Sequence, residues 1–259
     1  MSQKNEVYIL SAVRTPIGKL LGGLSNMSAV QLGTIAIKEA IERATIKPEN
    51  VDEVVMGHVL TAGLGQNTAR QAAIYAGIPV EKAAYTVNKV CGSGLRAVIS
   101  ATQAIKAGDI EIAVAGGMES MSNAPHLLKH RIGKKYGNDT LVDSMEYDGL
   151  WDVYNRFLMS KTGDIIAEKY KLTRKEIDEF AYISHLMAFN ATRNGGFKKE
   201  MTPVEIKPEK GESYLFETDE GIRTDTTTEK LAKLNPLNKS AYWSSRTNGI
   251  VSSFPGRKK

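Results

Sequence analysis

Four β-rich runs alternate with three helical patterns over the first 117 residues, and this order constrains the fold more than any other feature. The β-rich runs are EVYILSAVRTPIG, VDEVVMGHVL, AAYTVNKV and IEIAVAGG. The helical patterns are SAVQLGTIAIKEAIERATI, with Ser28 available as an N-cap, TARQAAIYAGI, and GSGLRAVISATQAIKAG, which ends at Gly108. A β-α-β-α-β-α-β order predicts a mostly parallel sheet covered by helices on both faces.

After Gly117 the sequence loses its periodicity for about forty residues, which is typical of a functional loop region. Helical spacing then resumes, with TRKE as a capping box at Thr173 and Gly195-Gly196 as a stop. From Met201 the pattern predicts strands, turns and a further helix. We therefore expect an α/β domain over residues 1–117, an inserted α+β loop domain over 118–235, and a divergent, disordered tail over 236–259.

The charge of the chain is concentrated at its end. The formal net charge is +5, and all 29 acidic residues lie at or before Glu229. From Asn235 onward there are five basic residues and no acidic ones. The rest of the chain is neutral, which argues against a nucleic-acid partner. With no apolar leader, no long apolar span and a single cysteine, the sequence predicts a cytoplasmic protein without a membrane partner.

The single cysteine, Cys91, lies where a predicted strand turns into a helix. Backbone N–H groups at the helix start point toward it, and the positive end of the helix dipole favours its thiolate form. Gly92 and Gly94 remove side chains around the sulfur, so that a carbonyl can approach. This context favours a nucleophile. The alternative is that Cys91 is a small buried hydrophobic residue, as isolated intracellular cysteines commonly are.

Two other kinds of site are disfavoured by the sequence. The segment GSGLRA fits the dinucleotide pattern G-x-G-x-x-G/A, but the next strand ends in glycines rather than in an acidic residue, and Glu119 comes too late. His126 and His130 stand four residues apart, but no third metal ligand is evident and the neighbouring lysines and arginine would repel a cation. His58 and His185 fit structural roles. We expect neither a dinucleotide nor a metal site.

The segment VNKVCGSGLRAVISATQAI resembles the acyl-cysteine signature of the thiolases. VRTPIGK, GQNTARQAA, AGGMESMSNAPHLL and DEGIRTDTTTEKLAKL resemble further thiolase segments in the expected order. The resemblance covers residues 5 to about 236 and is closest to the acetyl-CoA acetyltransferases. It implies one half of a layered αβαβα fold, with a mixed sheet and helices on both faces, plus the inserted loop domain.

The resemblance also implies a reaction. Cys91 would accept an acetyl group from acetyl-CoA, with its own N–H as one oxyanion donor, and a second acetyl-CoA would take that group to give acetoacetyl-CoA. The reverse reaction would cleave a 3-ketoacyl-CoA. Coenzyme A thioesters are substrates, and no cofactor is implied. Arg223 matches a residue beside the CoA nucleotide, Leu150 one along the pantetheine path, and Lys230 another CoA contact. The alternative for Arg223 is a solvated turn residue.

Some expected features are missing. Leu158 stands where many acetoacetyl-CoA thiolases have histidine, and Met159-Ser160 stands in place of Met-Gly. The Gly-His-Pro-like, Cys-x-Gly-Gly and Asn-Glu motifs of the second thiolase half do not occur, and the composition changes near Pro236. A frameshift, a truncation or a split enzyme would each explain this. The alternative function is therefore a catalytically incompetent fragment that acts with a complementary half or as a homo-oligomer. A redox role for Cys91 is a third possibility.

Overall fold

The computed structural model describes residues 6–237, and these residues form two compact units. The first unit comprises residues 6–16, 24–149 and 200–217, and the second comprises residues 17–23, 150–199 and 218–237. Residues 118–149 therefore group with the predicted α/β domain, so this division differs from the boundary expected at Gly117. The predicted tail lies outside the described residues, apart from positions 236 and 237.

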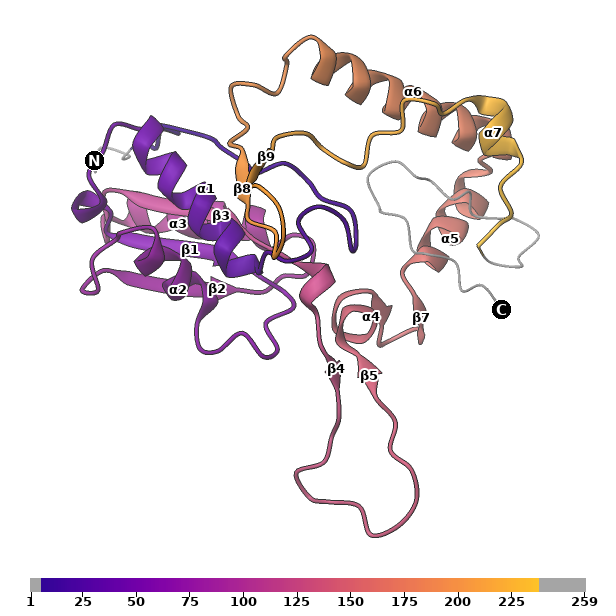
Figure 1. Cartoon of the computed structure of the whole chain (residues 1–259), viewed down its shortest axis with the longest axis horizontal. Coiled ribbons are helices and arrows are strands. Elements are labelled where there is room, and N and C mark those ends of the chain that lie inside the picture. The colour runs from indigo at the N-terminus through magenta and orange to yellow at the C-terminus, as the bar shows by residue number, and fades with distance from the viewer. Residues whose placement is uncertain (1–5, 238–259) are drawn as a thin grey trace. The chain divides into compact units, whose positions relative to one another are not determined.

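A parallel sheet forms the centre of the first unit (Figure 1). Its strands pair in the order β2-β1-β3, and both pairings are parallel. The strands are β1 (Glu53–Gly57), β2 (Ala83–Val87) and β3 (Ala113–Gly117). The helices beside them are α1 (Ala29–Arg43), α2 (Thr68–Tyr75) and α3 (Ser93–Ala107). Among the described residues, these six elements match the predicted alternation from its first helix onward.

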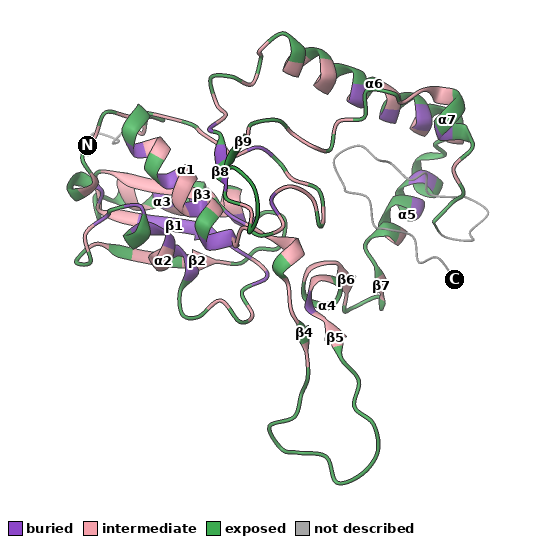
Figure 2. Cartoon of the chain, viewed as in Figure 1, coloured by how far each residue is buried: buried purple, intermediate pink, exposed green. Residues whose placement is uncertain are grey.

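Helices cover both faces of this sheet because successive side chains of β1 point in opposite directions. Val54 and Met56 share a hydrophobic cluster with residues of α1 and α2. Val55 points to the other face and is fully buried, and a Cβ on Gly57 would meet the first turn of α3. Figure 2 shows β1 as the buried centre of the unit. The predicted α/β class is confirmed, and β1 has the two-sided burial of an internal parallel strand.

The predicted helix boundaries are also confirmed. The side chain of Ser28 accepts from Gln31 N and that of Gln31 accepts from Ser28 N, which forms a capping box at the start of α1. Thr173 and Glu176 form the same motif at the start of α6 (Arg174–Arg193). Gly108 ends α3 in a left-handed conformation, with φ of 84°.

The first β-rich run does not form the buried strand that its pattern predicts. In the described part of this run, Arg14 makes one isolated bridge, to Met201, and Tyr8, Ile9 and Leu10 are exposed. A β-rich run becomes a strand only where a neighbour supplies matching backbone groups. The short chain segment at residues 200–202 supplies them only at Arg14, whose N–H donates to Glu200 and whose carbonyl accepts from Thr202.

The remaining elements of the first unit are short. They carry the antiparallel pairs β4-β5 and β8-β9, and the loop between β4 and β5 is exposed (Figure 2). The predicted strands after Met201 are thus present. The elements are η1 (Pro48–Asn50), η2 (Met121–Asn123), β4 (His126–Leu127), β5 (Val142–Asp143), α4 (Ser144–Gly149), β8 (Val204–Ile206) and β9 (Tyr214–Phe216).

The second unit is mainly helical. It contains the antiparallel pair β6 (Trp151–Asp152) and β7 (Phe157–Leu158), and the helices α5 (Ser160–Tyr170), α6 and α7 (Thr228–Ala232). Arg174 at the start of α6 pairs with Asp178 and donates to the carbonyls of Leu231 and Leu234, which fixes the C-terminal end of α7 against α6. Within residues 6–237, no helix combines the length and the apolar character needed to cross a bilayer.

Candidate active site around Cys91

The three parallel strands end at the same edge of the sheet, and their following loops carry the polar residues of the candidate site. Gly57 at the end of β1 is in register with Val87 of β2 and with Gly117 of β3. His58 follows β1, the turn that contains Cys91 follows β2, and Glu119 follows β3. In open α/β sheets this carboxyl edge is the usual place for ligands.

Cys91 lies in a tight turn between β2 and α3, and it is exposed. Gly92 is the N-cap of α3, so the thiol stands one residue before the cap of a 15-residue helix. The preceding residue, Val90, has φ of 49°, a left-handed conformation that β-branched residues rarely adopt. The exposure supports the nucleophile interpretation of Cys91 over the buried-core alternative.

Glycines let the first turn of α3 rest directly on the strand ends. A Cβ on Gly57 would lie 2.4 Å from the carbonyl carbon of Ser93 and 2.5 Å from Gly94 N. A Cβ on Gly117 would lie 3.2 Å from the Cα of Gly94. The sequence predicts that Gly94 clears space around the sulfur. In the structure Gly94 also permits the close contact between α3 and β3.

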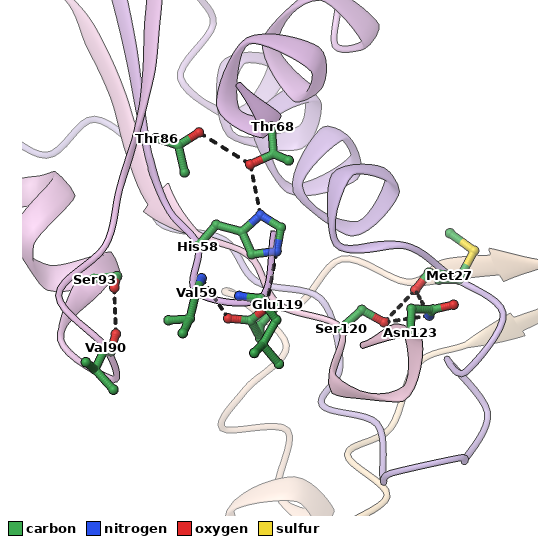
Figure 3. Close-up of polar contacts among 11 residues, drawn as sticks. Met27, His58, Val59, Thr68, Thr86, Val90, Ser93, Glu119, Ser120 and Asn123 are labelled. Carbon is green, nitrogen blue, oxygen red and sulfur yellow. Dashed lines mark hydrogen bonds and ion pairs between the residues drawn. The ribbon is translucent and has the colours of Figure 1, made fainter. Parts of the chain in front are cut away.

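A buried polar cluster links the loops after β1 and β3 (Figure 3). His58 is 1% exposed, and its Nδ1 lies 2.9 Å from the hydroxyl of Thr68. Its Nε2 lies 3.2 Å from Oε1 of Glu119. The same carboxylate accepts hydrogen bonds from the backbone N–H groups of Val59 and Leu60, at 3.0 and 3.3 Å. His58 therefore has the structural role expected for it, with Glu119 as a partner that the sequence pattern does not indicate.

The three predicted CoA contacts belong to the second unit. Leu150 is half-buried, and its carbonyl accepts from Met159 N across the β6-β7 pair. Arg223 and Lys230 are exposed and lie on either side of Asp225 in sequence. Nζ of Lys230 donates to Oδ2 of Asp225 at 2.8 Å. This hydrogen bond and the charge of Lys230 lower the pKa of Asp225, with a smaller contribution from Arg223. Lys230 is thus paired with the Asp225 carboxylate, and Cys91 lies in the other unit.

The other histidines occupy different settings. His185 on α6 is buried, and its Nδ1 accepts from the backbone N–H of Arg223 at 3.3 Å, which anchors the segment that carries the predicted CoA arginine. His130 contacts Asp139 at 3.1 Å on the exposed β4-β5 loop. Among residues 6–237, no group of three or more histidine, cysteine, aspartate or glutamate side chains is arranged to hold a metal ion.

Known proteins share the features of this chain. The chain belongs to the thiolase family: the family described as thiolase, N-terminal domain, matches residues 7–248. This confirms the resemblance drawn from the motifs, and the match continues beyond residue 236, where the motifs end.

Curated and structural relatives agree with this assignment. The chain is 51% identical over 232 residues to an acetyl-CoA acetyltransferase of Cupriavidus necator and 47% identical over 232 residues to a probable acetyl-CoA acetyltransferase of Escherichia coli. Each match covers 89% of this chain and 59% of the relative. The crystal structure of the Bacillus anthracis acetyl-CoA acetyltransferase superposes with a TM-score of 0.88 at 37% identity, covering 92% of this chain and 60% of that one. The thiolase fold is therefore shown, and the chain spans about three fifths of these relatives' length.

Proposed function

We propose that this chain carries the acylating step of an acetyl-CoA C-acetyltransferase and that Cys91 is the acyl acceptor. The observation that supports this most directly is an exposed cysteine at the strand-to-helix turn on the carboxyl edge of the sheet, in a chain of the thiolase family. Relatives named acetyl-CoA acetyltransferases suggest acetyl-CoA as substrate, or a 3-ketoacyl-CoA in the reverse direction. The CoA thioester supplies the reactive group, and no further cofactor is needed.

The proposed chemistry begins with attack by the Cys91 thiolate on the thioester carbonyl. A bond forms between Sγ and the acyl carbon, the bond from that carbon to the CoA sulfur breaks, and CoA leaves as a thiolate that takes a proton from solution. The N–H of Cys91 is the proposed donor to the oxyanion of the tetrahedral intermediate.

Carbon–carbon bond formation requires a base that removes a proton from the α carbon of a second acetyl-CoA. His58 follows the neighbouring strand, but it is 1% exposed and held between Thr68 and Glu119, so a substrate proton does not reach it. We therefore propose that a complementary thiolase segment supplies the base for the complete reaction. This segment would correspond to the part of the relatives that this chain does not cover.

Recognition of CoA is proposed for the second unit. Arg223 would meet the nucleotide, Leu150 the pantetheine arm, and Lys230 a further polar group of CoA. Arg223 is exposed and so is available to a planar or anionic partner. Lys230 must exchange its contact with Asp225 for one with the ligand. Arg223→Ala should weaken CoA binding about fivefold in calorimetric titration, which is the scale of one exposed ionic contact.

The acylation step can be tested directly on the purified chain. Incubation with acetyl-CoA should add one acetyl group to the peptide that contains Cys91 and release one CoA, as measured by mass spectrometry and thiol titration. Cys91→Ala should abolish both. If iodoacetamide labels the native chain at Cys91 but acetyl-CoA leaves it unmodified, the proposed function is wrong.

Exposed apolar side chains favour a second candidate function, association with a complementary thiolase segment. On α3, Ala97 and Ala101 face the sheet and are buried, whereas Leu95, Val98 and Ile99 are 68%, 38% and 39% exposed. Such an apolar helix face is typical of a surface that another protein segment covers. A second copy of the chain is the other occupant to consider.

Coexpression with the part of the Cupriavidus necator relative that this chain does not match provides the test. The two polypeptides should copurify and form acetoacetyl-CoA from acetyl-CoA. Leu95→Lys should prevent copurification, whereas Tyr154→Lys, at a 92% exposed position of the second unit, should not. Self-association in the absence of the added segment, measured by light scattering, would instead favour a homo-oligomer.

A further inference from the structure

The turn that presents Cys91 contains a backbone conformation that must be held in place. Val90 has φ of 49°, in the left-handed region, where its Cβ and both γ-methyl groups crowd the backbone. A short turn of this kind would relax to a negative φ unless its neighbours prevented this. Because Val90 directly precedes Cys91, such a relaxation would change the direction in which the thiol leaves the backbone.

The hydroxyl of Ser93 bonds to the backbone on both sides of this strained residue. Its Oγ donates to the carbonyl of Val90 at 2.6 Å and accepts from the N–H of Lys89 at 2.8 Å (Figure 3 draws the first of these). The N–H of Val90 donates to Oδ1 of Asn88 at 2.9 Å. Both backbone groups of Val90, and the preceding N–H, are therefore bound by side chains rather than by a neighbouring strand.

Ser93 is itself held rigidly. It is 3% exposed and is the first residue of α3, and its own N–H donates to the Val90 carbonyl at 3.0 Å. The missing side chain of Gly57 lets the Cβ and backbone of Ser93 sit directly against the end of β1. The contact with β1 therefore holds Ser93, and the hydrogen bonds of its hydroxyl hold the turn.

We propose that Ser93 is a positioning residue for Cys91: its hydroxyl keeps Val90 in the left-handed conformation and thereby fixes the direction of the thiol. The inference deepens the proposed function, since the thiol that it places is the proposed acyl acceptor. The placement is a property of the turn, so it can be measured with a reagent that does not involve coenzyme A.

The experiment uses the full chain in four forms: wild type, Ser93→Ala, Val90→Gly and the double variant. Ser100→Ala, a half-buried serine on the same helix, is the matched control. The rate constant for alkylation of Cys91 by iodoacetamide is measured under native conditions and divided by the rate for the same chain in denaturant. Thermal unfolding is followed in parallel, and rates are compared only at temperatures where every variant is folded.

Ser93→Ala should slow native alkylation about tenfold, because the thiol loses its fixed orientation at the helix start. Glycine adopts a positive φ without strain. In the Val90→Gly background, Ser93→Ala should therefore change the alkylation rate by less than about threefold. The difference between its effects in the two backgrounds measures the coupling between Ser93 and Val90, as in a double-mutant cycle. Ser100→Ala should react as the wild type does.

Two outcomes overturn the proposal. In the first, folded Ser93→Ala reacts at the wild-type rate. In the second, it slows equally in both backgrounds, so that Ser93 acts on stability or packing and not through Val90. Acetyl transfer from acetyl-CoA is measured separately on the wild type. A chain that is alkylated normally but never acetylated contradicts the proposed function, while the alkylation cycle still decides the role of Ser93.

Discussion

Substituting Gly57 by alanine tests whether the nucleophile turn depends on direct contact between α3 and the end of β1. The new Cβ would lie 2.4 Å from the carbonyl carbon of Ser93 and 2.5 Å from Gly94 N. Carbon atoms in contact normally lie about 3.5 Å apart, so the first turn of α3 must move by about 1 Å. The opposing atoms belong to the backbone, so a change of side-chain rotamer cannot relieve the clash.

Overpacking of this kind costs about 1–3 kcal/mol of unfolding free energy. For a chain of this size, that loss lowers the melting temperature by roughly 2–12 °C. Displacing the turn by about 1 Å should also slow acetyl transfer to Cys91, by about tenfold to a hundredfold. Circular dichroism during heating measures the first effect, and mass spectrometry of acetylated chain measures the second. Gly57→Ala with wild-type stability and wild-type acetylation would refute the contact argument.

Three further predictions concern other parts of the molecule. Gly163→Ala in α5 should raise the unfolding free energy by about 0.5–1 kcal/mol in chemical denaturation, because its Cβ meets nothing within 4 Å and alanine favours the helix. Hydrogen bonds from the backbone N–H groups of Ile112 and Glu111 lower the pKa of Asp52. The ionised Asp52 therefore stabilises the fold above the ordinary carboxyl pKa, and this stabilisation is lost as the pH falls through the lowered pKa. In chemical denaturation, Asp52→Ala should lower the unfolding free energy by about 1 kcal/mol at neutral pH and change it little in acid. Lys230→Ala should raise the pKa of Asp225 toward its ordinary value in a carbon-detected NMR titration, because Lys230 is the main cause of its lowering.

Local signals in the sequence were sufficient for most of the helices. Capping residues such as Ser28 and Thr173 act within their own helix turn, so their pattern alone located the starts of α1 and α6. Strands depend on partners far along the chain. The run that includes Tyr8 and Leu10 has the composition of a strand, but among residues 6–237 it forms one β-bridge, at Arg14, and the sequence carries no sign of that limit.

The candidate site was predicted in part for the same reason. The position of Cys91 between a strand and a helix is predictable because its signals, a β-rich run and flanking glycines, are local. The hydroxyl of Ser93 acts over three residues, but its role depends on the left-handed φ of Val90, which the letters V-C-G do not indicate. The sequence pattern relates Glu119 only to the ribose-binding acidic residue of a dinucleotide site, for which it comes too late. Its contacts with Val59 and His58 arise from the strand order, since β1 and β3 are neighbours in space and not in sequence.

The contacts of Glu119 also affect when the site forms during folding. Its hydrogen bonds to Val59 and Leu60 close a loop of about sixty residues, and such nonlocal contacts form later than the turns of a helix. Cys91 lies inside that loop and is the sole thiol of the chain. Pulsed alkylation during refolding should therefore show the thiol reaching its native reactivity only in the final phase, after α3 has gained its helical circular dichroism.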